Sequence, residues 1–191
     1  MNPKILVFAG SAREGSLNKK LARVAAKAIN DSGGEASLID LRDYPMPIYE
    51  GDHETREGMP PAARKLRELF VSHAAFLIVS PENNGSMPSL LKNTIDWLSR
   101  DMDGRSGLEP YKGKVAALMA ASPGAFGGVL GLVHLRMSLT KLFVHVISDQ
   151  FPLPNADKAF AEDGSLTQAW QQRTVQTVVQ KLIETTKKLA S

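Results

Sequence analysis

The stretch KILVFAGSAREGSLNKKLA, residues 4–22, places an apolar run directly before a glycine-containing loop and the start of a helical pattern. The run at 4–8 is typical of a buried parallel strand, which is covered on both faces and so lacks alternation. Gly10 and Gly15 have the spacing of a mononucleotide phosphate loop, but Ser16 and Leu17 stand where that loop needs Lys and Ser or Thr. The stretch therefore predicts a strand, a loop for a single terminal phosphate, and a helix, and it excludes a P-loop NTPase.

Four further apolar runs have the same character, and helical patterns separate them. The runs lie at residues 36–41, 74–80, 114–120 and 143–147. Apolar spacings of three and four mark helices near residues 17–28, 62–70, 91–98 and 175–183, and a largely apolar helix is expected near 129–143. This alternation predicts one doubly wound α/β domain over residues 1–191. A phosphate loop after the first of five strands favours a parallel sheet in the order 2-1-3-4-5, with helices on both faces.

Composition excludes several classes of function. The formal net charge is only +3 and the cations are scattered, so no nucleic-acid partner is expected. The chain has no cysteine, which excludes thiol redox chemistry and iron–sulfur clusters; an organic cofactor must carry any electrons. No apolar run approaches about 18 residues, and the N-terminal run is too short for a signal peptide. We therefore expect no membrane partner and a cytoplasmic location. The four histidines share no ligand spacing, so no metal site is predicted.

Ligands in such sheets bind beyond the carboxyl ends of the strands, so the loops after strands 1, 3 and 4 are the candidate site. The first loop carries Ser11, Arg13, Ser16 and Asn18 at the start of a helix. A helix N-terminus offers unpaired N–H groups, and hydroxyl, amide and guanidinium groups add donors for an anion. The alternative is that Ser16 only caps the helix and that Arg13 is a solvated surface charge. Agreement with the other two loops favours the phosphate.

The second stretch, SPENNGSMPSLLKNTIDWLSR at residues 80–100, begins with a loop that breaks its strand with Pro81 and the run Asn83-Asn84-Gly85. Asn and Gly tolerate left-handed backbone, which lets main-chain groups turn toward a ligand and suits edge-on recognition of a planar heterocycle. Pro88 fits the first turn of the following helix. The alternative is a plain strand-to-helix turn with Ser86 as its cap.

The third loop, residues 121–131, has Gly124, Gly127 and Gly128 within five positions, beside a possible donor at Ser122. Glycines allow the backbone to approach a flat ring or another subunit, although a Gly-rich turn into a helix explains them equally well. The helix that follows, near 129–143, is apolar almost all round. Such a helix is deeply buried or lies in a subunit contact, and we favour the contact.

Together the three loops resemble the NADPH-dependent FMN reductase family, the flavodoxin-like quinone and chromate reductases. The family pattern is G-S-x-R-x-x-S-x-N, then S-P-E-Y-N with L-K-N-x-x-D-W, then S-x-G-x-x-G-G. This chain has GSAREGSLN at 10–18, SPENN at 80–84, LKNTIDW at 91–97 and SPGAFGG at 122–128. Asn83 stands where the family usually places Tyr, and the loss of an aromatic neighbour would alter flavin affinity, redox potential or the room for acceptors.

The resemblance implies a flavodoxin-like three-layer sandwich that binds FMN. Its phosphate would be held by Ser11, Arg13, Ser16, Leu17 and Asn18. The isoalloxazine would be bordered by Pro81, Glu82, Asn83, Asn84 and Gly85, with Ser122 and Gly124 closing the site. Glu82 is equally well interpreted as a helix or dimer contact.

The implied activity is that of an NAD(P)H-dependent FMN or quinone reductase, working as a homodimer or homotetramer. NADPH or NADH passes a hydride to FMN in a ping-pong cycle, and a quinone, azo compound or metal oxyanion such as chromate then takes the electrons. No protein side chain is assigned a catalytic role. Two alternatives stay open: a flavodoxin-type electron carrier without a nicotinamide site, and a flavin-free interaction protein, suggested by Asn83.

Overall fold

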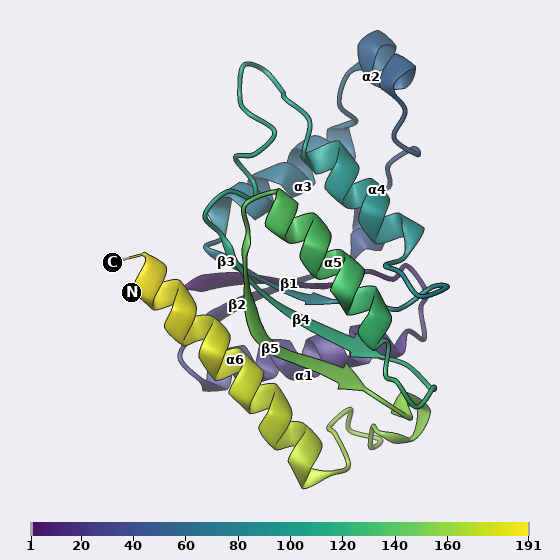
Figure 1. Cartoon of the computed structure of the whole chain (residues 1–191), viewed down its shortest axis with the longest axis vertical. Coiled ribbons are helices and arrows are strands. Elements are labelled where there is room, and N and C mark those ends of the chain that lie inside the picture. The colour runs from purple at the N-terminus through teal and green to yellow at the C-terminus, as the bar shows by residue number, and fades with distance from the viewer. Residues whose placement is uncertain (1, 191) are drawn as a thin grey trace.

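The computed structural model describes residues 2–190, which fold around one five-stranded sheet (Figure 1). All neighbouring strands are parallel, and their order is β2-β1-β3-β4-β5. The strands are β1 (Lys4–Ala9), β2 (Glu35–Ile39), β3 (Ala75–Val79), β4 (Val115–Ala121) and β5 (His145–Leu153). The predicted strand order is confirmed.

Helices cover both faces of the sheet and make it a three-layer sandwich (Figure 1). The helices on the two faces are α1 (Leu17–Asp31), α3 (Pro61–Ser72), α4 (Ser89–Leu98), α5 (Val129–Lys141) and α6 (Ala169–Leu189). The short helix α2 (Gly51–Glu57) buries none of its residues and projects away from the sheet (Figure 1). Successive residues of a strand point to opposite faces. Ile5 and Val7 therefore pack with α1 and α6, whereas Leu6 and Phe8 pack with α3, α4 and α5. Burial on both sides explains why the central strands show unbroken apolar runs.

Strand β5 is longer than the predicted run at 143–147, because it continues to Leu153. Its register against β4 shifts: Ala116 pairs with Val146, but Leu118 pairs with Gln150. The extra residues of β5 form a bulge, a feature that edge strands tolerate. The polar residues in this bulge interrupt the apolar pattern, which is why the sequence ended the strand too early.

The segment after β2 contains α2 and is fastened along α4 by hydrogen bonds. The Asn93 amide donates to the carbonyl of Pro47 at 2.9 Å and accepts from the N–H of Tyr49 at 2.7 Å. The indole Nε1 of the fully buried Trp97 donates to the same Pro47 carbonyl at 2.8 Å. The LKNTIDW motif therefore acts, at these two positions, by anchoring a neighbouring loop.

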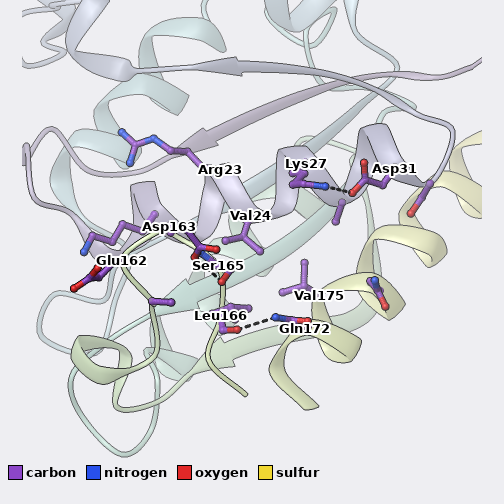
Figure 2. Close-up of a pocket in the computed structure, with 16 residues that line it drawn as sticks. Arg23, Val24, Lys27, Asp31, Glu162, Asp163, Ser165, Leu166, Gln172 and Val175 are labelled. Atoms are coloured by element: carbon purple, nitrogen blue, oxygen red, sulfur yellow. Dashed lines mark hydrogen bonds and ion pairs between the residues drawn. The ribbon is translucent and has the colours of Figure 1, made fainter. Parts of the chain in front are cut away.

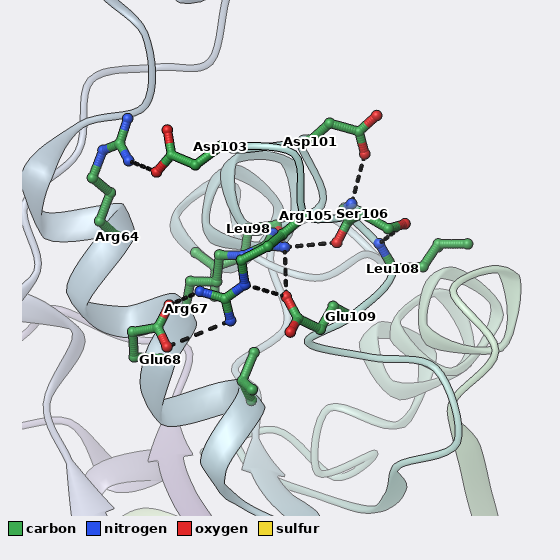
Figure 3. A network of polar contacts seen from close by, with 12 residues as sticks. Arg64, Arg67, Glu68, Leu98, Asp101, Asp103, Arg105, Ser106, Leu108 and Glu109 are labelled. Atoms are coloured by element: carbon green, nitrogen blue, oxygen red, sulfur yellow. Dashed lines mark hydrogen bonds and ion pairs between the residues drawn. The ribbon is translucent and has the colours of Figure 1, made fainter.

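A polar network fastens the loop between α4 and β4 to α3 (Figure 3). Arg67 is fully buried and donates to the carbonyls of Leu98, Arg100 and Ser106. Arg105 pairs with Glu109 at 2.7 Å and with Glu68 at 2.6 Å, and hydrogen bonds from these two carboxylates raise the pKa of Arg105. This loop leads into the amino end of β4, the edge of the sheet opposite the candidate site.

Candidate functional site

The loops after β1, β3 and β4 meet around a cavity of about 440 Å³ at the carboxyl ends of the strands. Predicted site residues that line it are Ser11, Arg13, Ser16, Leu17, Asn18, Pro81, Glu82, Asn83 and Ser122. Asn84, Gly85 and Gly124 are not part of its lining. Lining residues that the sequence interpretation did not assign to the site are Gly10, Ala12, Pro88, Ser89, Leu90, Ala121 and Pro123. Each of these lies within one of the three predicted loops or in the first turn of the following helix, so its place in the loop was the signal that could have assigned it.

The first loop presents unused hydrogen-bond donors to this cavity. Helix α1 begins at Leu17, and no residue within 2–190 accepts from the N–H groups of Leu17 and Asn18. Ser16 is the N-cap, and its hydroxyl lies 3.4 Å from the N–H of Lys19. The exposed Arg13 has no ion-pair partner among the described residues. Free helix N–H groups beside an uncompensated guanidinium fit a phosphate group.

Lys19, one turn into α1, is not available to such an anion. Its ammonium is almost buried and bonds the carboxylate of Asp40 at 2.7 Å, where Arg42 also donates. Burial raises the pKa of Asp40, but hydrogen bonds from Lys19 and Arg42 outweigh it and hold that pKa below its ordinary value. Asp40 therefore stays charged and neutralises Lys19. The cation left facing the cavity from this loop is Arg13.

Asn18 connects the first loop to the third. Its Nδ2 donates to the carbonyl of Ala121, and its Oδ1 accepts from the N–H of Ala121, both at 2.9 Å. The side chain is buried, so these bonds are shielded from water. Asn18 thus borders the cavity while its amide holds the end of β4 in place.

The second loop forms a tight hairpin. Asn83 and Ser86 exchange two main-chain hydrogen bonds, of 2.9 and 3.0 Å. Asn84 and Gly85 form its tip with φ of +50° and +76°, as a two-residue turn of this kind requires. The left-handed backbone expected here is present. Pro88 precedes α4 as its N-cap rather than standing in its first turn, and Ser86 does not cap that helix.

Two glycines of the third loop are explained by close packing within the chain. A Cβ at Gly127 would lie 2.7–2.8 Å from main-chain atoms of Pro152 and Leu153, and one at Gly128 would lie 3.0 Å from the Cβ of Ala120. Both residues have positive φ, which other residues rarely adopt. These glycines approach β5 and β4 of their own chain, whereas Gly124 is exposed.

Helix α5 is apolar on both sides but buried on only one. Leu132, Leu135 and Leu139 are fully buried. The opposite side exposes Leu130, Val133 and Met137, whose exposed fractions are 55, 54 and 66%. His134 is also exposed in the protomer.

A larger cavity of about 580 Å³ lies between α1 and the loop at 161–166 (Figure 2). Lys20, Arg23 and Lys27 of α1 contribute cations to its lining, and Glu162 and Asp163 contribute carboxylates. None of the predicted site residues lines it. Its size alone therefore does not make it the candidate site, because the convergent loops and free donors lie elsewhere.

Two further findings bear on the class of protein. Within residues 2–190, no three His, Cys, Asp or Glu side chains gather as a metal site would need. No helix in that same span combines the length and apolar character needed to cross a membrane.

Comparison with known proteins matches residues 3–158 to the family model described as NADPH-dependent FMN reductase. The chain belongs to the NADPH-dependent FMN reductase family. Members of this family are FMN- and NAD(P)H-dependent oxidoreductases, so the predicted enzyme class and cofactors are confirmed.

Relatives in this family include an NAD(P)H-dependent FMN reductase of Pseudomonas aeruginosa, 34% identical over 94% of this chain and 92% of that one. A quinone reductase of Escherichia coli is 34% identical over 76% of this chain and 73% of its own. Among solved structures, the flavoenzyme NAD(P)H:(acceptor) oxidoreductase FerB of Paracoccus denitrificans superposes with a TM-score of 0.81 at 28% identity, covering 97% of this chain and 98% of that one. The flavodoxin-like fold is thereby confirmed.

Proposed function

We propose that this chain holds FMN in the 440 Å³ cavity and uses NAD(P)H to reduce quinone-type acceptors. The observation that carries the proposal is the start of α1, where the free N–H groups of Leu17 and Asn18 lie beside the unpaired Arg13. This arrangement stands at the switch point of the sheet, where doubly wound folds bind nucleotides. Its position and its charge both suit the single phosphate of FMN.

Residues of the other two loops would border the ring. We assign this role to Pro81, Glu82, Asn83 and Ser122, which line the cavity, and to Asn84, Gly85 and Gly124, which belong to the same two loops but not to its lining. When bound, FMN supplies a ring that takes a hydride from NAD(P)H and, after the nicotinamide leaves, passes electrons on. The protein's part is to hold the ring, aim main-chain donors at its edge and admit two substrates in turn, which is a ping-pong scheme.

Quinones are the acceptors that the relatives support best. The Escherichia coli relative is named a quinone reductase, and one from a Burkholderia species is named a 2-hydroxy-1,4-benzoquinone reductase. Azo compounds and metal oxyanions such as chromate complete the proposed range. The Asn83 side chain lines the cavity, and no described residue bonds its amide, so it is free to contact an acceptor.

We further propose that residues 1–191 act as one domain and assemble as a homodimer or homotetramer through the exposed face of α5. Leu130, Val133 and Met137 form an apolar stripe that a second copy would cover. A cytoplasmic location stays a prediction.

The first experiment is the visible absorption spectrum of the purified protein, repeated anaerobically after addition of NADPH. A flavin spectrum that bleaches is expected. A flavin spectrum that persists would favour an electron carrier that needs a protein donor. Protein that stays colourless after incubation with excess FMN would contradict the proposal and favour a flavin-free role.

A further inference from the structure

The hairpin after β3 has two sides with different neighbours. On one side, Pro81, Glu82 and Asn83 line the cavity. On the other side, the same hairpin packs against the first turn of α5. The hairpin spans few residues, and Asn84 at its tip is exposed. Its position therefore depends on its contacts with α5.

The first fastening is the carboxylate of Glu82. Its Oε2 accepts from the N–H of Gly131 at 3.0 Å. Gly131 is the third residue of α5, and the N-cap of this helix, Gly128, offers no side chain to cap it. A carboxylate at this place satisfies an otherwise free N–H group and interacts favourably with the helix dipole. Glu82 therefore does for α5 what a capping side chain would do, but from a different loop.

The absence of a side chain at Gly131 makes this contact possible. A Cβ there would lie 3.2 Å from both the Cβ of Glu82 and the carbonyl oxygen of Ser86. The hairpin and the helix thus meet at the distance of backbone against backbone. Such close approach leaves little room for the hairpin to shift while the Glu82 bond is intact.

A second fastening lies one turn further along α5. The hydroxyl of Ser86 and Nδ1 of His134 are 3.0 Å apart, within hydrogen-bonding distance. Glu82 and Ser86 flank the turn of the hairpin, so the two contacts hold both of its strands to one helix.

We propose that Glu82 is a positioning residue: its carboxylate fastens the 82–86 hairpin to α5 and thereby fixes the main chain that borders the flavin-ring site. The inference deepens the proposed function and relies on it for the identity of the ligand. Ser86 and His134 assist from the far strand of the hairpin. The carboxylate acts through main-chain geometry and exchanges no proton with a substrate.

The test compares Glu82→Ala with Glu82→Gln, because Gln keeps an oxygen of the same reach that can accept from Gly131. One readout needs no flavin: the hydrogen-exchange rates of the Gly131, Asn83 and Ser86 amides in the apo-protein, measured by NMR. The second is the dissociation constant of FMN, measured by fluorescence titration. Glu162→Ala, which removes an exposed carboxylate outside the 440 Å³ cavity, is the control.

We expect Glu82→Ala to speed exchange of all three amides and to weaken FMN binding, each by about tenfold or more. Glu82→Gln should stay within about threefold of the natural protein, since it loses the interaction with the helix dipole but keeps the hydrogen bond. Faster exchange at Gly131 alone, with Asn83, Ser86 and FMN affinity unchanged, would overturn the proposal, because Glu82 would then be a helix cap only. Equal increases in the exchange rates and in the FMN dissociation constant for Glu82→Gln and Glu82→Ala would also overturn the proposal.

The two proposals fail in different ways. If the natural protein binds no FMN but Glu82→Ala still frees the Asn83 and Ser86 amides, the proposed function is wrong and the fastening stands. If Glu82→Ala does not fold, Ser86→Ala and His134→Ala replace it. Each should speed exchange of the Asn83 and Ser86 amides. The double variant should exchange no faster than either single variant, because both substitutions remove the same contact. If the two substitutions have additive effects on these exchange rates, or if neither changes them, the contact between Ser86 and His134 does not hold the hairpin to α5.

Discussion

Asn18 and Ala121 are 103 residues apart in sequence, yet the side-chain amide of the first forms two hydrogen bonds, each 2.9 Å, with the main chain of the second. Asn18 lies in the first turn of α1, and Ala121 is the last residue of β4. The pair therefore ties the start of α1 to the end of β4 at the border of the 440 Å³ cavity.

Asn18→Ala should lower the free energy of unfolding by about 2–4 kcal/mol, because it removes two buried hydrogen bonds and leaves the polar groups of Ala121 without partners. Urea denaturation of the apo-protein measures the loss. Gln180→Ala, which removes an exposed amide from α6, should change stability by less than about 0.5 kcal/mol. A loss as small as that of the control would contradict the role given to Asn18.

Arg13→Ala should weaken FMN binding by about 1.5–3 kcal/mol, the range for a hydrogen bond to a charged group. Arg13 is exposed and has no partner in the described chain, so little change in stability is expected. A fluorescence titration gives the affinity. Arg23→Ala, which removes an exposed guanidinium from α1, is the matched control, because Arg23 does not line this cavity. Equal affinities for the two variants would remove Arg13 from the site.

Asn93→Ala should release the segment that contains α2. The variant loses the bonds to Pro47 and Tyr49, and stability should fall by about 1–2 kcal/mol. Limited trypsin digestion should then cut faster at Arg56. Lys92→Ala, which breaks only an exposed pair with Asp96, should cost about 0.3–0.5 kcal/mol and leave the cleavage rate unchanged. Matching digestion rates for the two variants would show that Asn93 does not anchor the segment.

Asp40 makes a pH-dependent contribution to stability. Burial raises its pKa, but bonds from Lys19 and Arg42 lower it more, so the pKa in the folded protein is below its ordinary value of 3.8. Such a carboxyl stabilises the fold above the unfolded pKa and loses that effect as pH falls through the folded pKa. Asp40→Asn should therefore lower the free energy of unfolding by about 1.5–3 kcal/mol at pH 7. The difference in stability between this variant and the natural protein should become smaller below pH 3.8.

Urea denaturation across this pH range tests the point, with the exposed Asp157→Asn as control. A deficit of the same size at pH 3 and pH 7 would mean that the charge of Asp40 is not what stabilises this region.

Met137→Asp should dissociate the proposed homo-oligomer without unfolding the protomer. The side chain is exposed on the apolar stripe of α5, and a charge there costs little in the free protomer but cannot be buried against a second copy. Light scattering after gel filtration gives the mass. Gln180→Asp, on the helix layer across the sheet, should leave the mass unchanged. An unchanged mass for Met137→Asp would place the subunit contact elsewhere.

The sequence indicated the site by the type of residue in each loop, but it could not assign each residue its contacts. The motif residues Asn93 and Trp97 anchor Pro47, Asn18 holds Ala121, and Gly127 makes room for β5. These roles depend on which main-chain groups come close after folding, and a spacing pattern contains no such distances. The bulge in β5 escaped prediction because Ser148 and Asp149, which are exposed and half-buried, interrupt the apolar run of this edge strand.

The sequence by itself determined the alternation of strands and helices, the strand order and the three loops that meet at the carboxyl ends of the strands. These follow from apolar periodicity and chain connectivity, which are properties of neighbouring residues. Tertiary structure alone decided that Glu82 bonds Gly131, that Asp40 neutralises Lys19, and that Arg13 is left free. Partner choice among polar groups is made by distance and burial, and both arise only when segments far apart in the chain pack together.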